Sequence, residues 1–428
     1  MSITEETREG FYLNEEGEWV PEGWTNSPLN QIVSDFIDYR GKTPKKTNTG
    51  VPLITAKVVK DGRVLQTDEY IADSDYDSWM RRGIPRADDV ILTTEAPLGE
   101  VAFIPEGKIA LAQRIITLRG IDGQLDNRFL KYSLQSPLMQ YRLIARESGS
   151  TVSGIKSSEL KVTHLLHPTD FAEQKAIADA LRSLDNKIEL LREQNETLEA
   201  LAQTLFKRWF IDFNFPNESG KPYKESGGSI DALEETSLDT FVNFNPIEKI
   251  NKKEEYLFFD MKCLALNQLS LSAGILKSTS SATSFREGDT LLAKITPCLE
   301  NGKTGLVQDL KGEKVARGST EFIVMRPIEN GSACFNYCLA RNSKFRNYAI
   351  RSMSGSSGRQ RVPLDRVKSY SVINRSDLIQ DFEVLASPCF QKIRINTQQI
   401  ETLTQLRDTL LPKLMKGEIR IPKVEISQ

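Results

Sequence analysis

Two stretches of the chain carry apolar residues at alternating steps of three and four positions, which is the spacing of one face of a helix. The first runs from Ile177 to Trp209 and follows Asp170 and Glu173, a pair with the spacing of a helix capping box. The second begins at Phe382. A helix of ~40 residues, at about 1.5 Å per residue, is on the order of 60 Å long, too long for the interior of a globular domain. Each helix is therefore expected to lie against a partner helix, and the two can pack on each other within one chain.

Polar residues in the two apolar stripes predict the direction of this pairing. In heptad numbering Asn195 falls at position a and Asn396 at position d. Antiparallel helices bring a against d, and each amide is costly against an apolar neighbour, so we expect antiparallel helices in which the two amides meet. The expected seam consists of Ile188, Leu191, Asn195 and Leu198 in the first helix and of Ile393, Asn396, Ile400 and Leu403 in the second.

The same register makes further predictions along the helices. It places Trp209 on Phe382, and it leaves Leu184 against Arg407 as a poor layer. Proline has no N–H to donate within a helix, so prolines 388 and 412 predict a break or a kink in the second helix at each position.

The remainder of the chain repeats itself once. Asp89-Val-Ile-Leu matches Asp289-Thr-Leu-Leu, and Tyr132-Ser-Leu matches Tyr337-Cys-Leu. In each copy, β-rich runs punctuated by Gly and Pro precede a short helical stretch, a Gly-Ser loop and the long helix. We predict an α+β fold with two pseudo-two-fold-related α/β domains, each followed by a long helix, and with the two helices in an antiparallel coiled coil. The predicted segments are 1–169 (first domain), 170–215 (first helix), 216–376 (second domain) and 377–428 (second helix and C-terminal tail).

Composition narrows the class of protein. The 428 residues include 56 Lys and Arg against 58 Asp and Glu, and no apolar run approaches the length of a membrane span. This is typical of two or more soluble domains. The acidic, polar N-terminus lacks the features of a secretory signal, so we expect a cytoplasmic protein. Five cysteines without a Cys-x-x-Cys spacing favour neither a disulfide framework nor a zinc site.

Motifs for catalysis are missing from the sequence. Gly41-Lys-Thr and Gly302-Lys-Thr look like the ends of phosphate-binding loops, but the required Gly five positions earlier is Phe36 in one and Pro297 in the other. There is no Asn/Asp-Pro-Pro-Tyr/Phe run to hold an adenine amino group and no Gly-x-Gly-x-x-Gly after a predicted strand. We therefore expect no catalytic residue, metal or cofactor site in this chain.

Basic stretches within both domains are candidates for contact with an acidic partner. Residues 39–66 hold seven Lys or Arg and one Asp, and residues 281–368 hold fifteen Lys or Arg and eight acidic residues. Such runs are usually solvated surface, but turn-forming loops with basic or amide side chains recur at equivalent places in both copies. In the first domain the candidates are Arg40, Lys42, Thr43, Lys45, Lys46, Lys57, Gln113, Arg114, Ser150, Thr151 and Lys156. In the second they are Lys294, Asn301, Lys303, Arg317, Ser319, Arg359, Gln360 and Arg361.

The organisation resembles a known family. Two divergent domains that each precede a similar long helix, with Pro21-Glu-Gly-Trp24, Arg208-Trp-Phe210 and the terminal Gly417-Glu-Ile-Arg-Ile421, resemble the specificity (S) subunit of Type I restriction-modification enzymes. The resemblance implies that each domain recognises one half of a split double-stranded DNA site. It also implies that the helices act as a spacer and as the dock for two methyltransferase subunits, which recruit restriction (translocase) subunits. S-adenosylmethionine, ATP and Mg²⁺ would then belong to those partners.

A physical argument from the residues points the same way. Duplex DNA has two-fold backbone symmetry, so a duplicated protein can place equivalent surfaces on two half-sites. Two alternatives remain at this point. A coiled-coil scaffold without DNA specificity would explain the helices but not the repeated basic loops, and a self-sufficient DNA methyltransferase or nuclease would need motifs that the chain lacks.

Overall fold

The computed structural model describes residues 9–14, 17–41, 43–148, 153–249, 255–266, 268–278, 281–356 and 358–421. The chain divides into two compact units. Unit 1 comprises Met1–Lys187 and Leu403–Gln428, and unit 2 comprises Ile188–Thr402. Each unit thus contains one sheet-rich domain together with a segment of each long helix. Within the described ranges, no helix is both long and apolar enough to cross a lipid bilayer.

Unit 1 contains two four-stranded sheets, which we call its large and its small sheet. The large sheet is antiparallel and has the order β11-β10-β13-β4, with β4 at Val33–Asp38, β10 at Val90–Thr94, β11 at Leu98–Phe103 and β13 at Ile115–Gly120. The small sheet has the order β12-β6-β9-β5, with β5 at Lys46–Thr47, β6 at Val51–Ile54, β9 at Tyr70–Ile71 and β12 at Ala110–Leu111.

Unit 2 repeats the large sheet strand for strand and three strands of the small sheet. Its large sheet has the order β16-β23-β20-β21, with β16 at Val242–Phe244, β20 at Thr290–Ala293, β21 at Thr304–Leu306 and β23 at Phe322–Pro327. Its small sheet has the order β18-β17-β22-β19, with β17 at Tyr256–Phe259, β18 at Ile275–Lys277, β19 at Thr283–Phe285 and β22 at Ala316–Gly318. In the small sheets, β17, β18 and β22 take the places of β6, β9 and β12, and a parallel pair joins β6 to β12 in unit 1 and β17 to β22 in unit 2. The predicted duplication and the α+β fold class are confirmed.

The other elements complete the two units. In unit 1 they are β1 (Phe11–Leu13), β2 (Trp19–Pro21), β3 (Trp24–Pro28), α1 (Leu29–Ile32), β7 (Val59–Lys60), β8 (Arg63–Val64), α2 (Tyr76–Trp79), α3 (Asn127–Gln135), α4 (Pro137–Ala145), α5 (Ser157–Lys161), β14 (His164–Pro168) and the start of α6 (Phe171–Phe206). In unit 2 they are β15 (Glu235–Ser237), α7 (Ala333–Arg341), α8 (Ser343–Arg351), α9 (Leu364–Lys368), β24 (Ser371–Ile373) and the larger part of α10 (Ser376–Met415). One π-helical turn, Lys207–Ile211, follows α6.

Alternation along the strands divides each core into two layers. In β10, Leu92 packs in the cluster that contains the helical residues Phe129 and Ile177, whereas Ile91 packs in the cluster of the small sheet with Leu53. The same alternation occurs in β20 of unit 2. Successive strand residues point to opposite faces, so the large sheet lies between the helices on one side and the small sheet on the other.

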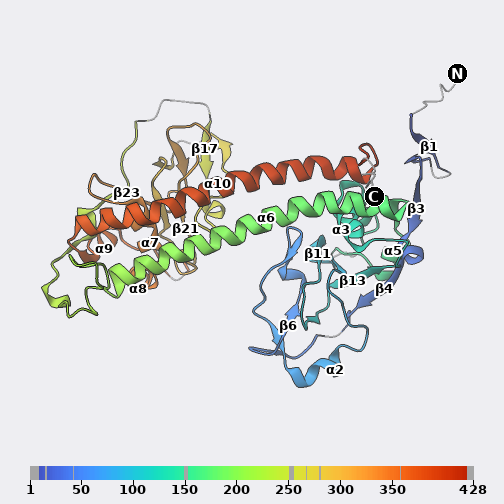
Figure 1. Ribbon diagram of the computed structural model, residues 1–428, viewed down its shortest axis with the longest axis horizontal. Coiled ribbons are helices and arrows are strands. Elements are labelled where there is room, and N and C mark those ends of the chain that lie inside the picture. Colours follow the sequence, from blue (N-terminus) through green and yellow to red (C-terminus); the bar gives the residue numbers. More distant parts are fainter. Residues whose placement is uncertain are drawn as a thin grey trace. The chain divides into compact units, whose positions relative to one another are not determined.

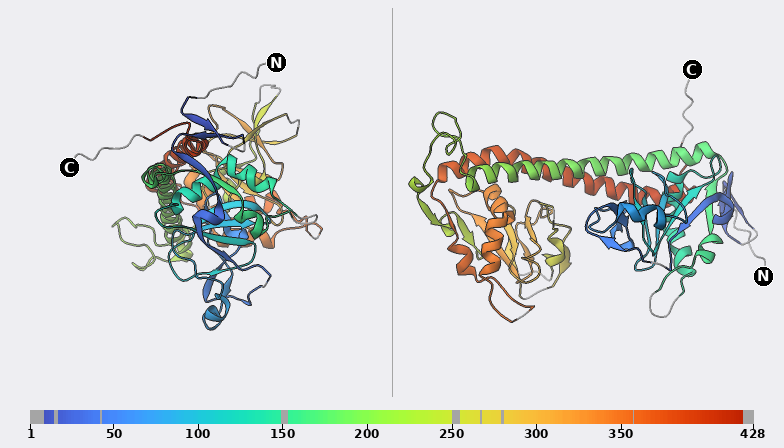
Figure 2. Two further views of the ribbon diagram at one scale, coloured as in Figure 1. Left: turned by 90° about the vertical axis from the view of Figure 1, so that its right-hand side faces the viewer. Right: turned by 90° about the horizontal axis from the view of Figure 1, so that it is seen from below.

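The predicted antiparallel pairing of the long helices is confirmed within both units. In unit 2 the side-chain amide of Asn396 donates to the Oδ1 of Asn195 at 2.9 Å, and the ring centroids of Trp209 and Phe382 lie 6.2 Å apart. In unit 1 the residues Ile177 and Leu414 share one core cluster. Figures 1 and 2 show α6 and α10 side by side from three directions. The layer of Ile188 on Leu403 joins one residue from each unit and stays a prediction.

The structure corrects two expectations about the second helix. Arg407 does not form a poor layer against Leu184, because its guanidinium donates to the Asp185 carboxylate at 3.0 Å. A break at Pro388 or at Pro412 is not found, since α10 is continuous from Ser376 to Met415, and a kink at either position stays a prediction. Each proline frees the carbonyl four residues earlier, and those residues, Val384 and Asp408, are exposed, so water can bind these carbonyls.

Candidate nucleic-acid interface

In unit 1, predicted DNA-contacting loops meet at one end of the large sheet. Glu95 follows β10 and forms a β-bridge with Gly154. Arg114 precedes β13, and its guanidinium lies 2.8 Å from the Glu95 carboxylate. This strand-end junction brings together three of the predicted residues, Gln113, Arg114 and Lys156.

Unit 2 has a strand-end junction at the equivalent place. Ile295 follows β20 and forms a β-bridge with Arg361. The guanidinium of Arg361 contacts both carboxylate oxygens of Glu321, at 2.7 and 2.9 Å, and the backbone N–H of Lys294 donates to the Glu321 carbonyl at 3.0 Å. The predicted residues gathered here are Lys294, Ser319, Arg359, Gln360 and Arg361.

The two junctions share their backbone plan but differ in their charges. The acid follows β10 in unit 1, as Glu95, whereas it precedes β23 in unit 2, as Glu321. The basic partner likewise moves from Arg114 to Arg361. Base edges in a DNA groove are distinguished by the placement of donors and acceptors. The two domains therefore present different chemistry from the same position in the fold.

The other described candidates lie outside the junctions. Around the small sheet of unit 1, Arg40 pairs with Asp38 (3.3 Å), Lys46 with Glu69 (2.8 Å) and Lys57 with Asp68 (3.8 Å), whereas Thr43 and Lys45 are exposed. In unit 2, Asn301 is exposed, Lys303 donates to the carbonyl of Met261 (2.8 Å), and Arg317 lies over the ring of Tyr256 (4.8 Å). Lys42, Ser150 and Thr151 fall outside the described residues.

Carboxylate partners decide how much positive charge each candidate offers to a phosphate. Arg361 lowers the pKa of Glu321, so this carboxylate stays ionised beside the guanidinium and offsets its charge. Within the part of the chain that the structure describes, the exposed side chains of Lys45, Lys156 and Arg359 have no carboxylate partner. These three cations are therefore the most available of the predicted set for phosphate contacts.

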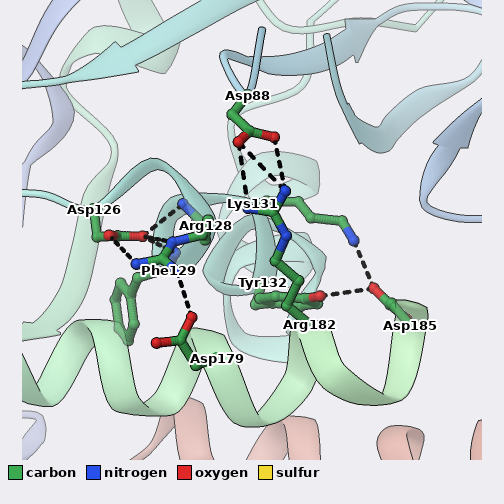
Figure 3. Close-up of polar contacts among 9 residues, drawn as sticks. All are labelled: Asp88, Asp126, Arg128, Phe129, Lys131, Tyr132, Asp179, Arg182 and Asp185. Atoms are coloured by element: carbon green, nitrogen blue, oxygen red, sulfur yellow. Dashed lines mark hydrogen bonds and ion pairs between the residues drawn. The ribbon is translucent and has the colours of Figure 1, made fainter. Parts of the chain in front are cut away.

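Sequence reasoning missed a polar cluster that holds the first domain on the long helices. The ammonium of Lys131 and the hydroxyl of Tyr132, both on α3, contact the Asp185 carboxylate on α6 at 2.7 and 2.8 Å (Figure 3). Arg407 of α10 contacts the same carboxylate. Burial by itself raises the pKa of Asp185, but Lys131, Tyr132 and Arg407 together hold it below its usual range. We call these four residues the Asp185 cluster.

More ion pairs join the first domain to α6 beside this cluster. Arg128 of α3 pairs with Asp126 and with Asp179, and Arg182 contacts Asp88 at 3.2 Å (Figure 3). The residues come from α3, from the loop before β10 and from α6. The first domain thus meets the helix through a polar contact with directional partners rather than through an apolar patch alone.

Unit 2 has a related cluster with its acid on a different helix turn. The hydroxyl of Tyr337 on α7, the counterpart of Tyr132, donates to Glu199 of α6 at 2.6 Å. Arg341 lies 3.5 Å from the same carboxylate. The repeat of Tyr132 as Tyr337 was visible in the sequence, but its partners were not, because they are 53 and 138 residues away along the chain.

Residues 21–24 and 417–420, which lie far apart in the sequence, meet in unit 1. The indole N–H of Trp24 and the guanidinium of Arg420 both donate to Glu173, at 3.1 and 2.6 Å. Gly417 has a φ of +64°, and a Cβ there would lie 2.6 Å from Cγ of Pro21. Contacts between the motifs at residues 21–24 and 417–421 therefore tie the first strands to the C-terminal turn. The side chain of Asp170 accepts from Ala172 at 2.8 Å, so the predicted capping residue at the start of α6 is confirmed.

Neither a metal cluster nor a histidine site is found in the described ranges. No group of three or more His, Cys, Asp or Glu residues there has the geometry to hold a metal ion. His167 is buried between Ser27 and the backbone of Pro168, and burial lowers its pKa. It therefore stays neutral within β14.

Comparison with known proteins gives consistent matches. Residues 21–200 match the family model described as the Type I restriction modification DNA specificity domain. The chain is 28% identical over 353 residues to the Type I restriction enzyme MjaIX specificity subunit of Methanocaldococcus jannaschii, covering 78% of each chain. It is 29% identical over 214 residues to the Type I restriction enzyme EcoEI specificity subunit of Escherichia coli, covering 47% of this chain and 35% of that relative.

A solved structure shares the fold. The crystal structure of the Type I restriction-modification system S subunit from M. genitalium aligns with a TM-score of 0.54 and 17% sequence identity. The alignment covers 91% of this chain and 96% of that one. At this identity the likeness supports the fold, with two domains and two long helices, over nearly the whole length of both chains.

Proposed function

Because this chain belongs to the Type I restriction-modification DNA specificity family, we propose that it is the DNA sequence-recognition subunit of a Type I restriction-modification complex. Each of its two domains reads one half of a bipartite site in double-stranded DNA. The chain itself is not an enzyme in this proposal. Cleavage and methyl transfer belong to partner subunits, and the cytoplasm is the compartment in which the complex meets its DNA.

One observation carries this proposal. The large sheets of the two units repeat the same strand order, and each unit has a strand-end junction at the same place with a different arrangement of charges. A shared backbone plan suits a shared ligand, the duplex, whereas different side chains suit two different half-sequences. A coiled-coil scaffold without DNA specificity gives no reason for this combination.

The long helices have two roles in the proposal. They set the spacing between the half-sites, and they dock two methyltransferase subunits, which in turn recruit the restriction subunits. S-adenosylmethionine, ATP and Mg²⁺ act in those partners. Co-purification of the chain with the products of neighbouring genes tests this part, and recovery of a methyltransferase is the expected result.

The decisive experiment exchanges one domain. Residues 1–169 are replaced by the corresponding domain of a relative, and the methylated sequence is determined in the complex. We expect one half of the recognised sequence to change and the other half to stay. The matched control replaces residues 216–376 instead, and it should change the opposite half. If either exchange altered both halves, or neither, the assignment of one half-site to each domain would be wrong.

The basic loops of the second domain can be tested separately. Replacing Lys303, Arg359 and Arg361 together should weaken binding and reduce the slope of log K against log salt by up to about one unit for each phosphate that is no longer neutralised. Arg359 has no carboxylate partner in the described ranges, so it should account for most of the change. An unchanged affinity and slope would show that these loops do not contact DNA.

Helix length should decide the gap between the half-sites. One heptad inserted after Leu191 and a matching heptad after Asn396 preserve the layers on both sides of the insertion. They lengthen the pair by about 10 Å at 1.5 Å per residue, which is roughly three base pairs of duplex. The variant complex, assayed on a library of spacings, should keep both half-sequences and prefer a longer gap. Retention of the original gap at full affinity would contradict the spacer role.

A further inference from the structure

The small sheet of unit 2 has one face that points away from the large sheet. Its inner face packs Phe259 and Phe285 against Leu291 of the large sheet in one core cluster. Side chains alternate along a strand, so the neighbouring residues of β17 and β22 point to the other side. The register places the β18 residues opposite them. This outer face, which we call the aromatic face, consists of Tyr256, Phe258, Ile275, Lys277 and Arg317.

Both cations of the aromatic face lie over aromatic rings. The Lys277 ammonium is 4.6 Å from the centroid of the Phe258 ring, and the Arg317 guanidinium is 4.8 Å from that of Tyr256. A ring attracts a cation through its quadrupole but does not neutralise it. No carboxylate of a described residue pairs with Lys277. Unlike Arg361, which is bound to Glu321, Lys277 therefore presents a full positive charge on a side chain that the ring holds in place.

An apolar residue lies beside these cations on the edge strand. The side chain of Ile275 in β18 is 60% exposed. An exposed apolar side chain between positive charges is compatible with the surface of duplex DNA, where it can contact sugars while the cations contact phosphates.

The corresponding sheet of unit 1 lacks this combination. Its β6 carries Pro52 opposite Tyr70 of β9. No cation of a described residue lies over the Tyr70 ring. The aromatic face is thus a property of the second domain and not of the shared fold.

We propose that the aromatic face of unit 2 binds the sugar–phosphate backbone of duplex DNA. Lys277 and Arg317 contact phosphates, Ile275 contacts the sugars beside them, and Phe258 and Tyr256 are positioning residues for the two cations. The inference rests on the proposed function, and it assigns a binding surface of the second domain beyond the strand-end junction. It also supplies a contact that depends on salt but not on the base sequence.

The test measures the affinity of the full-length chain for duplex DNA over a series of KCl concentrations. The probe is the duplex that the wild-type chain selects from a random library. Lys277→Ala should reduce the slope of log K against log salt by about 0.9, the value for one phosphate contact. Both proteins lose affinity when the salt is raised from about 50 to about 200 mM. The fold-loss of affinity of Lys277→Ala should be about 3.5 times smaller than the fold-loss of the wild type. Lys277→Arg should keep the slope, because it retains both the charge and the stacking.

Lys175→Ala is the matched control. Lys175 lies 4.7 Å from the ring of Phe171 at the start of α6, so this variant also removes one exposed lysine stacked on a phenylalanine. Its slope and affinity should equal those of the wild type. A second variant, Ile275→Asp, places a negative charge on the face and should weaken binding without changing the selected sequence. Equal thermal unfolding midpoints for the two alanine variants show that both fold.

The outcomes separate this inference from the proposed function. If the wild type binds its selected duplex and Lys277→Ala binds with the same slope and affinity, the aromatic face is not a DNA contact, although the proposed function stands. The same conclusion follows if Ile275→Asp has no effect. If the wild-type chain selects no sequence and binds no duplex, both the function and the inference are wrong.

Discussion

The amide pair between the long helices allows a quantitative prediction, because its two members are not equivalent. Asn396 is fully buried, whereas Asn195 is half-buried. The Asn396 side chain donates to Asn195 at 2.9 Å and makes a long contact with Gln194 at 3.4 Å. Its own Oδ1 accepts no hydrogen bond from any described residue. The wild-type layer therefore already contains one unsatisfied buried acceptor.

Single substitutions by leucine should then differ in cost. Asn195→Leu leaves the Asn396 amide buried with only the long contact to Gln194, and the penalty for an unsatisfied buried group predicts a loss of about 2–3 kcal/mol. Asn396→Leu removes the unsatisfied acceptor as well as the donor, and the remaining Asn195 can turn to water. We expect a loss of about 1 kcal/mol or less. The double variant should cost less than the sum, because it buries no unpaired amide.

Hydrogen exchange of the backbone amides in residues 188–206 and 376–402 measures the loss of stability within the helix pair itself. Two-state unfolding of the whole chain therefore need not be assumed. Protection should fall by roughly 30-fold or more in Asn195→Leu and by about fivefold or less in Asn396→Leu. Gln391→Leu, which replaces an exposed amide on α10, is the matched control and should have no effect. Equal losses for the two single variants, or a double variant equal to their sum, would refute the reasoning.

Three further predictions concern unit 1. Asp185→Asn leaves the Lys131 ammonium, whose side chain is 3% exposed, without its anion. The free energy of unfolding of the unit, measured in urea, should therefore fall by about 3–5 kcal/mol. An unchanged urea midpoint would show that the pair contributes nothing to stability. Gly417→Ala places a Cβ 2.6 Å from Pro21 at a φ of +64°. It should lower the thermal midpoint more than Gly123→Ala, whose Cβ meets nothing within 4 Å at a φ of +73°. Equal effects of the two substitutions would contradict the close approach. Burial lowers the pKa of His167 in the folded chain. Its stabilising contribution is therefore present above about pH 6.5 and is lost as the pH falls towards the folded pKa. His167→Gln should flatten the dependence of stability on pH in this range, and a dependence as steep as that of the wild type would exclude His167 as its origin.

Much of the architecture could be predicted because it depends on periodicity and repetition. The heptad phase of Asn195 and Asn396 was sufficient for the direction and register of the helices, since one wrong step would bury an amide against an apolar side chain. The repeats around Asp89 and Tyr132 indicated two copies of one domain. Pro388 shows the limit of local rules: the carbonyl that it frees belongs to the exposed residue Val384, and α10 continues through it.

The candidate site could be predicted only as a set of loops. Sequence showed that basic and amide residues recur near Arg114 and Arg361, but not that Glu95 and Glu321 pair with them. Those partners come from other strand ends and have no fixed spacing along the chain. The stacking of Lys277 on Phe258 was missed for a related reason, because it depends on the pairing of β17 with β18, which no loop motif indicates.

The Asp185 cluster limits which domains can be recombined. A crossover after residue 169 keeps Asp185 and Arg407 in the recipient but takes Lys131 and Tyr132 away with the outgoing domain. An incoming domain with a base and a hydroxyl at these two positions inherits a complete cluster, whereas one with apolar residues there leaves a largely buried carboxylate with one cation and no hydroxyl. New specificities should therefore arise most readily among donors that share this pair, however different their DNA-contacting loops are. Compatibility with the recipient helix, rather than the recognised sequence, would then decide which hybrids persist.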